Sequence, residues 1–500
     1  MSKGTVPTWF FSRNPMFADK TVFLCSDGEH LTYSAMWDLQ DLILQGVPAG
    51  SLLFLLCKND YIPITVYLGC LQKGCVPLLL PSSIAKEPLH SLMKRYQPEA
   101  ILLPTERTDP SSSCGKMLWT NFMWSLVATG LQSPILHSDL ALLLSTSGST
   151  GSPKLVRLSR NNLQSNAESI ATYLEITEQD RPITSLPMEY TYGLSVINSH
   201  LLKGSSLLIT DYGILDIRFW DFFRSAEATS FAGVPNSYTL LKRIGFFDME
   251  LPSLTTMTQA GGKLPKELQI EYAKWANTKG IRFFIMYGQT EATARMSYLP
   301  PDMCLKKPGS IGQAIPGGSF TLLAESSETC ANQPNGELIY SGQNVSLGYA
   351  ENADDLQKGD ENKGILYTGD LAHCDKEGYY YIIGRKKRFV KVSGKRVSLD
   401  ELEELLNSHI SIILSTAEEI SSLHLPRPES FLCAGKDDMI YIALICDPVP
   451  DSENTKLLTE ATLTFLGKQT SLRYSVFHIR FLPKIPRTGS EKINYNAILV

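Results

Sequence analysis

The densest group of residues that could contact a phosphate lies between Leu140 and Leu163, in LALLLSTSGSTGSPKLVRLSRNNL. An apolar run there leads directly into a loop of small and hydroxyl side chains, which comprises Thr146, Ser147, Gly148, Ser149, Thr150, Gly151 and, at its end, Lys154. Small residues let a backbone approach an anion closely, hydroxyls and amides donate to phosphate oxygens, and the lysine adds a point charge. The loop is not a Walker P-loop, because no Gly-Lys pair in the chain is followed by Ser or Thr. It predicts an anion site, with a flexible Ser/Gly linker as the alternative.

Such a loop needs strands and helices to position it, and the apolar pattern indicates them. From about Ser51 to Pro81 the chain predicts a strand, a helix and a strand. SLLFLLC and CVPLLLP are short apolar runs, and IPITVYLGCLQKG between them has helical spacing and stops at Gly74. The same alternation recurs in KLPKELQIEYAKWANTKG followed by IRFFIMYG. Helices that alternate with fully apolar strands predict an α/β fold with layers around largely parallel sheets.

The last third of the chain has a different pattern. GELIYSG, GILYTGD and GYYYIIGR are short Tyr- and Ile-rich strands between turn residues, so we predict a β-rich subdomain over 331–384. The basic stretch GRKKRFVKVSGKRV then suits a hinge and a hairpin, and VSLDELEELLNSH begins a helix with Ser398 and Asp400 as candidate caps. We place a domain boundary near Gly384 to Arg388. It separates a large N-terminal domain, residues 1–384, from a small α+β C-terminal domain, residues 385–500.

The composition is that of a folded protein of several units. The chain has 500 residues, of which 43% are hydrophobic and 19% charged. From the usual size of protein domains, this length predicts roughly two to four structural units. Its net charge of -5, with both signs mixed along the chain, does not favour nucleic acid as a partner. The ten cysteines form no CxxC pair, so reduced core thiols are expected. No signal-peptide core and no membrane-length apolar run is present, so we expect a cytoplasmic protein without a membrane span.

Several motifs occur in the order typical of one family. TSGSTGSPK resembles the phosphate loop of the adenylate-forming superfamily, which comprises acyl-CoA synthetases, aryl-CoA ligases, luciferases and peptide-synthetase adenylation domains. MYGQTEAT, YTGDLA, GYYYIIGRKKRFVKVSGKRV and LPKIPRTGSEKINYNAI resemble later motifs of the same superfamily, and together the matches cover nearly the whole chain. Taken alone, Glu291 is an ordinary surface carboxylate, Asp370 a turn residue and Lys492 a solvated tail lysine. The order of the motifs along the chain, rather than any single residue, supports the resemblance.

The resemblance implies that these motifs surround one ATP molecule. Tyr287 would stack on adenine, Thr290 would bond the α-phosphate, and Glu291 would bind the Mg²⁺ that bridges ATP. Asp370 would accept hydrogen bonds from both ribose hydroxyls, because an ionised carboxylate only accepts, and Arg385 would help hold ribose or phosphate. The implied nucleotide set also contains Gly288, Gln289, and the glycines Gly261 and Gly262 of TQAGGKLPKEL. A turn before a helix is the alternative for that glycine pair.

The C-terminal motifs imply a reaction in two steps. A carboxylate oxygen attacks the α-phosphorus of ATP, pyrophosphate leaves, and Lys492 bridges the substrate carboxylate and ATP oxygens. In the family, the mobile C-terminal domain then rotates about a hinge, which falls on Arg388 here. The rotation brings a face with Lys391 and Gly394 into the site for thioester formation. The acceptor thiol would belong to CoA or to the phosphopantetheine of a separate acyl or peptidyl carrier protein.

Two segments are predicted to shape the pocket for the acid. LPMEYTYGLSVINSHLLKG places Tyr190 where acyl and aryl ligases often have His, and Thr191 where amino-acid-activating relatives carry Asp. The missing acid at Thr191 favours a plain carboxylic acid over an α-amino acid, and we interpret the neighbouring Glu189 as an exposed loop acid. FAGVPNSYTLLKR resembles the FxGVP segment of the family, whose Phe231 and Gly233 could line the pocket or belong to the core.

Three other functions compete with an acid–thiol ligase as interpretations of the sequence. A P-loop kinase would need a Walker lysine and leaves YTGD and the Lys492 motif without a role. A stand-alone amino-acid-adenylating enzyme that serves a carrier protein is the second. The third is a degenerate nucleotide-binding homologue, because Leu155 and Glu491 stand where relatives favour glycine and Arg388 where they often have Asp or Lys.

Overall fold

The computed structural model describes residues 9–108, 115–145, 154–324, 335–392, 395–421, 426–436, 439–470, 472–487 and 493–499. Its largest sheet has eight strands in the order β18-β9-β8-β4-β3-β5-β7-β6. The central strands β5, β3, β4 and β8 are parallel, and the outer strands pair antiparallel. The strands are β3 (Leu52–Cys57), β4 (Val76–Pro81), β5 (Ala100–Pro104), β6 (Met117–Thr120), β7 (Trp124–Ala128), β8 (Leu140–Ser145), β9 (Leu155–Ser159) and β18 (Gly348–Ala350).

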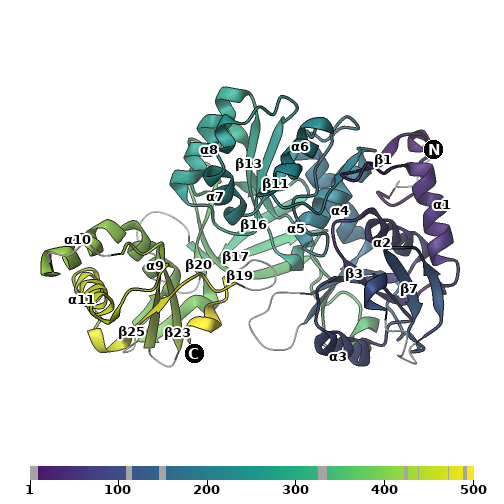
Figure 1. Cartoon of the computed structure of the whole chain (residues 1–500). Coiled ribbons are helices and arrows are strands. Elements are labelled where there is room, and N and C mark those ends of the chain that lie inside the picture. Colours follow the sequence, from purple (N-terminus) through teal and green to yellow (C-terminus); the bar gives the residue numbers. More distant parts are fainter. Residues whose placement is uncertain are drawn as a thin grey trace.

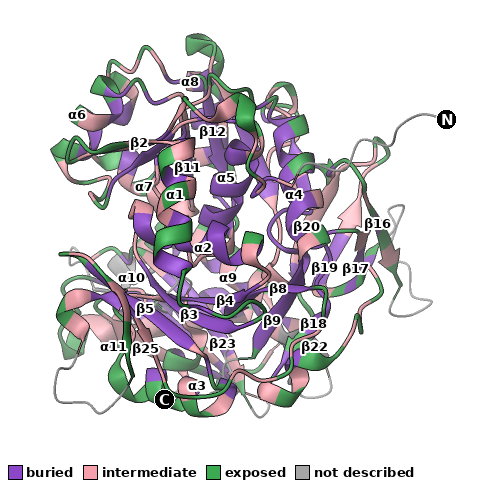
Figure 2. Cartoon of the chain, turned by 90° about the vertical axis from the view of Figure 1, so that its right-hand side faces the viewer, coloured by how far each residue is buried: buried purple, intermediate pink, exposed green. Residues whose placement is uncertain are grey.

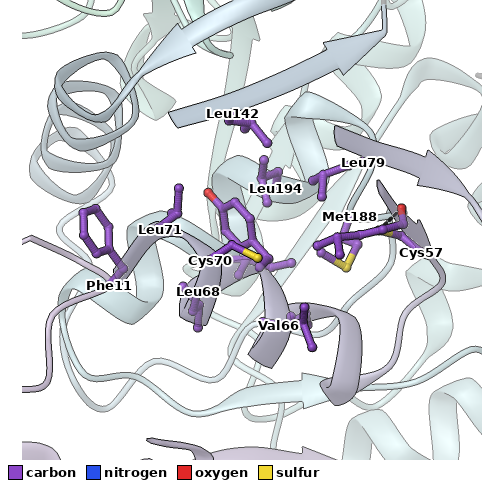
Figure 3. Close-up of a cluster of buried hydrophobic side chains, with 14 of the residues drawn as sticks. Phe11, Cys57, Val66, Leu68, Cys70, Leu71, Leu79, Leu142, Met188 and Leu194 are labelled. Atoms are coloured by element: carbon purple, nitrogen blue, oxygen red, sulfur yellow. Dashed lines mark hydrogen bonds between the residues drawn. The ribbon is translucent and has the colours of Figure 1, made fainter. Parts of the chain in front are cut away.

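Strand β3 shows why the centre of this sheet is apolar on both sides. Leu53 and Leu55 belong to one buried cluster, whereas Leu52, Phe54 and Leu56 belong to the cluster on the opposite face. Successive side chains of a strand point to opposite faces, so a strand covered on both sides must be apolar throughout. Helices α1 (Tyr33–Leu44) and α2 (Tyr61–Lys73) supply the first cluster, part of which Figure 3 shows, and α3 (Lys86–Tyr96) supplies the second. The strand–helix–strand pattern predicted for residues 51–81 is confirmed.

A second sheet holds five strands in the order β11-β12-β13-β14-β15. Strands β11 to β13 are parallel, and β14 and β15 add antiparallel. The strands are β11 (Ser230–Gly233), β12 (Thr256–Gln259), β13 (Arg282–Tyr287), β14 (Ser297–Leu299) and β15 (Gln313–Ala314). A small sheet of β10 (Leu207–Ile209), β1 (Thr21–Cys25) and β2 (His30–Thr32) lies beside it.

Five helices cover the two faces of the second sheet. Phe283 and Ile285 of β13 face a cluster with α6 (Ile217–Ser225), α7 (Pro235–Arg243) and α8 (Lys266–Lys279). Phe284 and Met286 face the other side, toward α4 (Arg160–Tyr173) and α5 (Thr191–Leu202). Because α4 and α5 also contribute to the core of the large sheet, they form a layer that both sheets share. Figure 2 shows this layered arrangement with its buried strands, and it confirms the predicted α/β fold class.

The remaining elements follow in the C-terminal third. An antiparallel sheet in the order β16-β17-β19-β20 comprises β16 (Gly318–Leu323), β17 (Asn335–Gly342), β19 (Ile365–Cys374) and β20 (Tyr380–Arg385). The predicted hairpin follows as β21 (Phe389–Val392) and β22 (Lys395–Ser398). One more core then contains α9 (Leu399–Ser408), α10 (Ile410–Ser421), α11 (Ser452–Gln469), β23 (Ser430–Lys436), β24 (Met439–Ile445) and β25 (Phe477–Leu482). In Figure 1 this green-to-yellow part lies to one side of the rest and is reached through β20.

The structure also bears on the predicted helix caps, on the cysteines and on membrane-spanning helices. Ser398 caps α9, because its side chain accepts a hydrogen bond from the Glu401 N–H at 3.2 Å. Asp400 does not cap this helix; its carboxylate accepts instead from the backbone N–H of Arg385 at 3.0 Å. The described cysteines are all free thiols, as expected for core packing. No described helix combines the length and the apolar character that a membrane crossing needs.

Arg157 fastens the large sheet to the segment that follows β18. Its side chain, fully buried, forms an ion pair with Glu361 and donates to the carbonyls of Leu347 and Tyr349, each at 3.0 Å. It also donates to the carbonyl of Lys358. Carbonyls buried without a donor are costly, so this one side chain fixes the course of the backbone around Tyr349.

We therefore expect Arg157→Leu to lower the free energy of unfolding by about 2–3 kcal/mol, because several acceptors lose their donor at once. Chemical denaturation measures the change. Arg181→Leu is the control, since it removes an exposed pair with Glu227 that is worth at most about 1 kcal/mol. Equal losses in the two variants would show that Arg157 has no special role.

Candidate active site

Asp370 is the centre of a hydrogen-bonded group that joins the second sheet to the β16–β20 sheet. It is only 2% exposed, and its Oδ2 accepts from the Tyr287 hydroxyl at 2.5 Å and from Gln289 Nε2 at 2.9 Å. Its Oδ1 accepts from Arg385 Nε at 3.1 Å, across the β19–β20 register that pairs the two residues. Four residues predicted for the nucleotide, from three separate motifs, therefore meet at one carboxylate.

The pKa shifts of Tyr287 and Arg385 favour their role as hydrogen-bond donors to Asp370. Burial, together with the charge of Asp370, raises the pKa of Tyr287 well above its ordinary value, so the phenol keeps its proton and donates. The same carboxylate raises the pKa of Arg385. Arg385 differs from its partners in exposure, because 63% of its side chain faces solvent against 3% for Asp370. It is the donor most able to move.

A second group contains Glu291 and the end of the glycine-rich loop. Glu291 Oε1 accepts from the hydroxyl of Tyr349 at 2.8 Å, and Lys154 Nζ lies 6.0 Å from the centroid of the same aromatic ring. Lys154 also pairs with Glu351 at 2.6 Å. The β9–β18 pairing, which aligns Tyr349 with Val156, brings these side chains together. Tyr349 is not among the residues that the sequence predicts for the site, because only the pairing of β18 with β9 places its ring beside Lys154.

The glycine-rich loop connects β8 to β9. Thr146, Ser147, Gly148, Ser149, Thr150 and Gly151 lie outside the described residues. Its two ends are placed, because Ser145 at the end of β8 pairs with Leu155 at the start of β9 in an antiparallel register. The loop therefore closes a hairpin, and its lysine end is at the Tyr349 ring.

A strained turn follows Glu291 directly. Thr293 has φ 66° and ψ -57°, which is costly for a β-branched residue, on the order of 1–3 kcal/mol. Its carbonyl accepts from the Thr191 hydroxyl, and its own hydroxyl donates to the Asn344 carbonyl at 2.7 Å. Asn344 Nδ2 donates to the carbonyls on both sides of this residue, those of Ala292 and Arg295, at 2.9 and 3.0 Å. Thr191, a predicted acyl-pocket residue, is thus one of the groups that hold the turn.

Two glycines of the predicted nucleotide set are required by close contacts. Gly261 has φ +85°, and a Cβ there would lie 2.4 Å from the hydroxyl of Tyr190. A Cβ at Gly288 would lie 1.7 Å from the carbonyl oxygen of Ala294, so this glycine lets β13 pass the strained turn. A Cβ at Gly262 would meet only the ring of Pro235, at 3.1 Å.

The two segments predicted for the acid meet at one cavity. Phe231 and Ala232 of FAGVP line a small cavity of about 20 Å³ together with Val196 of α5. The ring of Phe231 also packs against Trp220, with 6.3 Å between ring centroids. At Gly233 a Cβ would lie 3.0 Å from Phe231, so that position is held within the aromatic packing.

The interpretation of Glu189 as an exposed loop acid is wrong. The residue is half-buried, and its Oε2 is shielded from solvent without a hydrogen-bond partner among the described residues. Burial raises its pKa to about 7, with a smaller contribution from the charge of Asp211. Sequence position could not show this, because the segments that cover Glu189 are distant in the chain.

The predicted hinge residue is anchored inside the C-terminal part. Arg388 Nε lies 2.6 Å from Asp400, its Nη2 lies 3.0 Å from Glu403, and its guanidinium stacks 3.6 Å from the ring centroid of Tyr495. Asp400 also accepts from the Arg385 N–H, so one carboxylate spans the residues on both sides of Lys386.

The remaining C-terminal predictions fall on residues that the structure does not describe. The side chain of Lys391, the whole of Gly394 and the whole of Lys492 belong to this group. The segment with Lys492 is bracketed by a β-bridge between Arg487 and Ile493, and Arg487 donates to Asn236 at 3.4 Å.

Comparison with known proteins gives a consistent family. The model of the family described as AMP-binding enzyme matches residues 10–350. A protein of Humulus lupulus described as probable CoA ligase CCL9 is 24% identical over 452 residues, which cover 83% of this chain and 85% of that protein. A 2-succinylbenzoate–CoA ligase of Oceanobacillus iheyensis is 26% identical and covers 90% of this chain and 91% of its own length.

The fold is also that of a solved enzyme. The o-succinylbenzoate CoA synthetase of Bacillus subtilis, in complex with the acyl-adenylate intermediate OSB-AMP, superposes with a TM-score of 0.74 at 20% identity. The superposition covers 98% of this chain and 97% of that one. A structure of the same enzyme with ATP and magnesium ion gives a TM-score of 0.73 at 19% identity, over 99% and 100% of the two chains.

The raised pKa of Glu189 predicts a pH-dependent stability. Between its ordinary value of 4.5 and about 7, the folded protein holds a proton that the unfolded chain lacks, so stability falls as pH rises through this window. Glu189→Gln removes the effect, and we expect it to stabilise the protein by on the order of 1 kcal/mol at about pH 8 and by little at about pH 4. Unfolding curves across this pH range measure it. The exposed Glu250→Gln is the control, and parallel curves for Glu189→Gln and wild type would contradict the assignment.

Proposed function

The chain belongs to the family of AMP-binding enzymes and is an AMP-forming acid–thiol ligase; on this premise we propose that it joins a small carboxylic acid to AMP and then transfers the acyl group to a thiol. The observation that carries the proposal is the buried Asp370, reached by Tyr287, Gln289 and Arg385. A buried carboxylate that retains an exposed, displaceable donor suits a ligand with neighbouring hydroxyls, such as the ribose of ATP.

The number of hydrogen bonds at Asp370 indicates how ribose would enter. A carboxylate accepts about four hydrogen bonds, and Tyr287, Gln289 and Arg385 supply three. Two ribose hydroxyls need two acceptor positions, so one protein donor must leave. Arg385 is the exposed one, and we assign it the movement from Asp370 to the ribose or phosphate of the bound nucleotide.

Glu291 fits a role in holding Mg²⁺. Its Oε1 is oriented by Tyr349, while its Oε2 carries no hydrogen bond within the described part of the chain. Mg²⁺ in nucleotide enzymes is usually held by one or two carboxylates, waters and substrate phosphates, so a single oriented acid is sufficient. When bound, the ion would supply positive charge that offsets the negative charge of the ATP phosphates.

The other residues would act on the phosphates and on the acid. A carboxylate oxygen of the acid attacks the α-phosphorus, and the bond to pyrophosphate breaks. Thr290, Lys154 and Lys492 then stabilise the negative charge on the phosphate oxygens. The hydroxyls and amides of residues 146–151 would hold the same phosphates. No side chain of the protein needs to become covalently attached.

For the second step, we propose that the C-terminal domain moves as one body against the N-terminal domain, with the pivot inside the boundary from Gly384 to Arg388. Arg388 is bound to Asp400, Glu403 and Tyr495, so it would travel with the C-terminal domain. The flexible point would then lie before it, at Lys386 and Lys387, and the contact between the Arg385 N–H and Asp400 would break. This movement would withdraw Lys492 and bring the face with Lys391 and Gly394 to the site.

Relatives named as CoA ligases support CoA as the acceptor, with a carrier-protein phosphopantetheine as the alternative. The missing acid at Thr191 supports a plain carboxylic acid rather than an α-amino acid, which leaves a stand-alone amino-acid-adenylating enzyme as the second candidate. We also propose a cytoplasmic location, where ATP and acceptor thiols are both available.

Lys492 is proposed to act in the adenylation step and not in thioester formation, and the variant Lys492→Ala tests this. We expect this variant to lose adenylation by about a hundredfold or more in acid-dependent ATP–pyrophosphate exchange, because a cation at the phosphates is gone. It should still form a thioester from supplied acyl-AMP and CoA. Lys484→Ala, an exposed lysine of the same region, is the control. Wild-type protein without any acid-dependent exchange would identify a degenerate homologue, and equal loss of both steps in Lys492→Ala would refute the proposed roles.

Asp370→Asn tests the ribose contact. An amide has one acceptor oxygen and one donor NH₂ group, so it accepts hydrogen bonds from two hydroxyls less well than a carboxylate does. We therefore expect the KM for ATP to rise about ten- to a hundredfold. The preference of the enzyme for ATP over 2′-deoxy-ATP should shrink in the same variant. Asp360→Asn replaces an exposed turn carboxylate and serves as the matched control. If Asp370→Asn kept the full preference for the 2′-hydroxyl, Asp370 would not bind ribose.

A further inference from the structure

Lys154, which directly follows the glycine-rich loop, is paired with a carboxylate that the sequence does not predict for the site. Its Nζ lies 2.6 Å from Glu351 Oε1. The antiparallel register of β9 and β18 ends with Leu155 opposite Ala350. Lys154 and Glu351 therefore stand opposite each other, one residue beyond the paired strands. Opposite residues of neighbouring strands are close together on one face of the sheet, and opposite charges there attract. The fold thus brings this pair together.

The same face of the sheet meets the acid assigned to the metal. Residues two apart in a strand point to one face, so Tyr349 lies beside Glu351. The Tyr349 hydroxyl donates to Glu291 Oε1 at 2.8 Å, and its ring centroid lies 6.0 Å from Lys154 Nζ. Burial and the charge of Glu291 raise the pKa of Tyr349 well above its ordinary value, so the phenol stays a donor. One side chain therefore contacts both the metal acid and the lysine.

The backbone at Glu351 is held by the protein, whereas the two charged side chains of the pair are open to solvent. The Asp355 carboxylate accepts from the Glu351 N–H at 2.7 Å, and the Ala350 carbonyl accepts from the Tyr96 hydroxyl at 3.0 Å. By contrast, 51% of the Lys154 side chain and 60% of the Glu351 side chain are exposed. Exposed ion pairs are weak. Lys154 can therefore exchange Glu351 for another anion without disturbing the backbone at Glu351.

The balance of charge in this group is unfavourable for a nucleotide as it stands. Glu291 and Glu351 supply two negative charges, and Lys154 supplies one positive charge. A polyphosphate would bring further negative charge to the same place. The charge of Glu291 would be offset by the Mg²⁺ that it is proposed to hold. Glu351 has no such role, so it would repel the phosphates and occupy the lysine proposed to bind them.

We propose that Glu351 is a positioning residue of the adenylation step, which holds Lys154 at the site and competes for it with the phosphates of ATP and with pyrophosphate. Lys154 exchanges the carboxylate for a phosphate when ATP binds, and Glu351 takes the lysine back as pyrophosphate leaves. The lysine keeps an anionic partner throughout. The inference rests on the proposed function and adds to it a residue that sets the affinity of the site for phosphates.

Binding of ATP measured by calorimetry tests this inference without an acid substrate. The probes are ATP with Mg²⁺ and adenosine, which has no phosphate. We expect Glu351→Gln to lower the Kd for ATP about two- to fivefold, the scale of one exposed ion pair, because the carboxylate no longer competes for Lys154. In acid-dependent exchange the KM for pyrophosphate should fall by a similar factor. The Kd for adenosine should stay unchanged, which also shows that the variant is folded.

Dependence on the lysine separates an exchange of partners from a general effect of charge. Lys154→Met should raise the Kd for ATP, and adding Glu351→Gln to this variant should then bring no further gain. Asp354→Asn is the matched control, because it removes the same charge from an exposed carboxylate three residues later. We expect this control to change the Kd for ATP little.

Four results would overturn the inference and leave the ligase function intact. They are an unchanged Kd for ATP in Glu351→Gln, a gain that persists beside Lys154→Met, an equal gain in Asp354→Asn, and a Kd that rises in Glu351→Gln. The last result would identify Glu351 as a group that supports the bound metal or nucleotide. Wild-type protein that binds no ATP and exchanges no pyrophosphate would instead overturn the proposed function.

Discussion

The carboxylate of Asp370 is almost fully removed from solvent, so its charge has to be met by hydrogen-bond donors from the protein or from a ligand. The donors come from different elements: Tyr287 ends β13, Gln289 follows it, and Arg385 ends β20. One buried charge therefore fixes the junction between the second sheet and the β16–β20 sheet. It also fixes the start of the C-terminal part, because the backbone of Arg385 is bound in turn by Asp400. The candidate nucleotide site is built on this junction.

The short turn around Thr293 links the two halves of the proposed chemistry. Its unfavourable backbone conformation persists because Thr191 and Asn344 bind the carbonyls and hydroxyl around it. The turn sends Glu291 toward Tyr349 and the end of the glycine-rich loop, and it sends Arg295 into the layer between the sheets. Metal binding and selection of the acid would thus depend on the same few peptide units, and a change in the turn would disturb both.

Three arginines of the described chain are held by three different kinds of partner. Arg157 satisfies carbonyls and an acid and fixes the backbone near Tyr349, whereas Arg388 is neutralised by acids of its own C-terminal part. Arg295 has only neutral partners within the described chain. The folded chain itself neutralises the first two arginines.

The sequence by itself determined the α/β fold class and the motifs that meet at the site. Strands such as SLLFLLC are recognisable because both faces of a central parallel strand are buried, and β13 is recognisable for the same reason. MYGQTEAT and YTGDLA could be predicted to bind one nucleotide because they occur in the order typical of a known family, and that order can be read from the sequence. Only the tertiary structure decided which side chains are paired. Tyr349 meets Glu291 across 58 residues, and the Oε2 of Glu189 is shielded from solvent without a hydrogen-bond partner in the described part of the chain. Burial and pairing arise from contacts between remote segments, and local patterns carry no information about them.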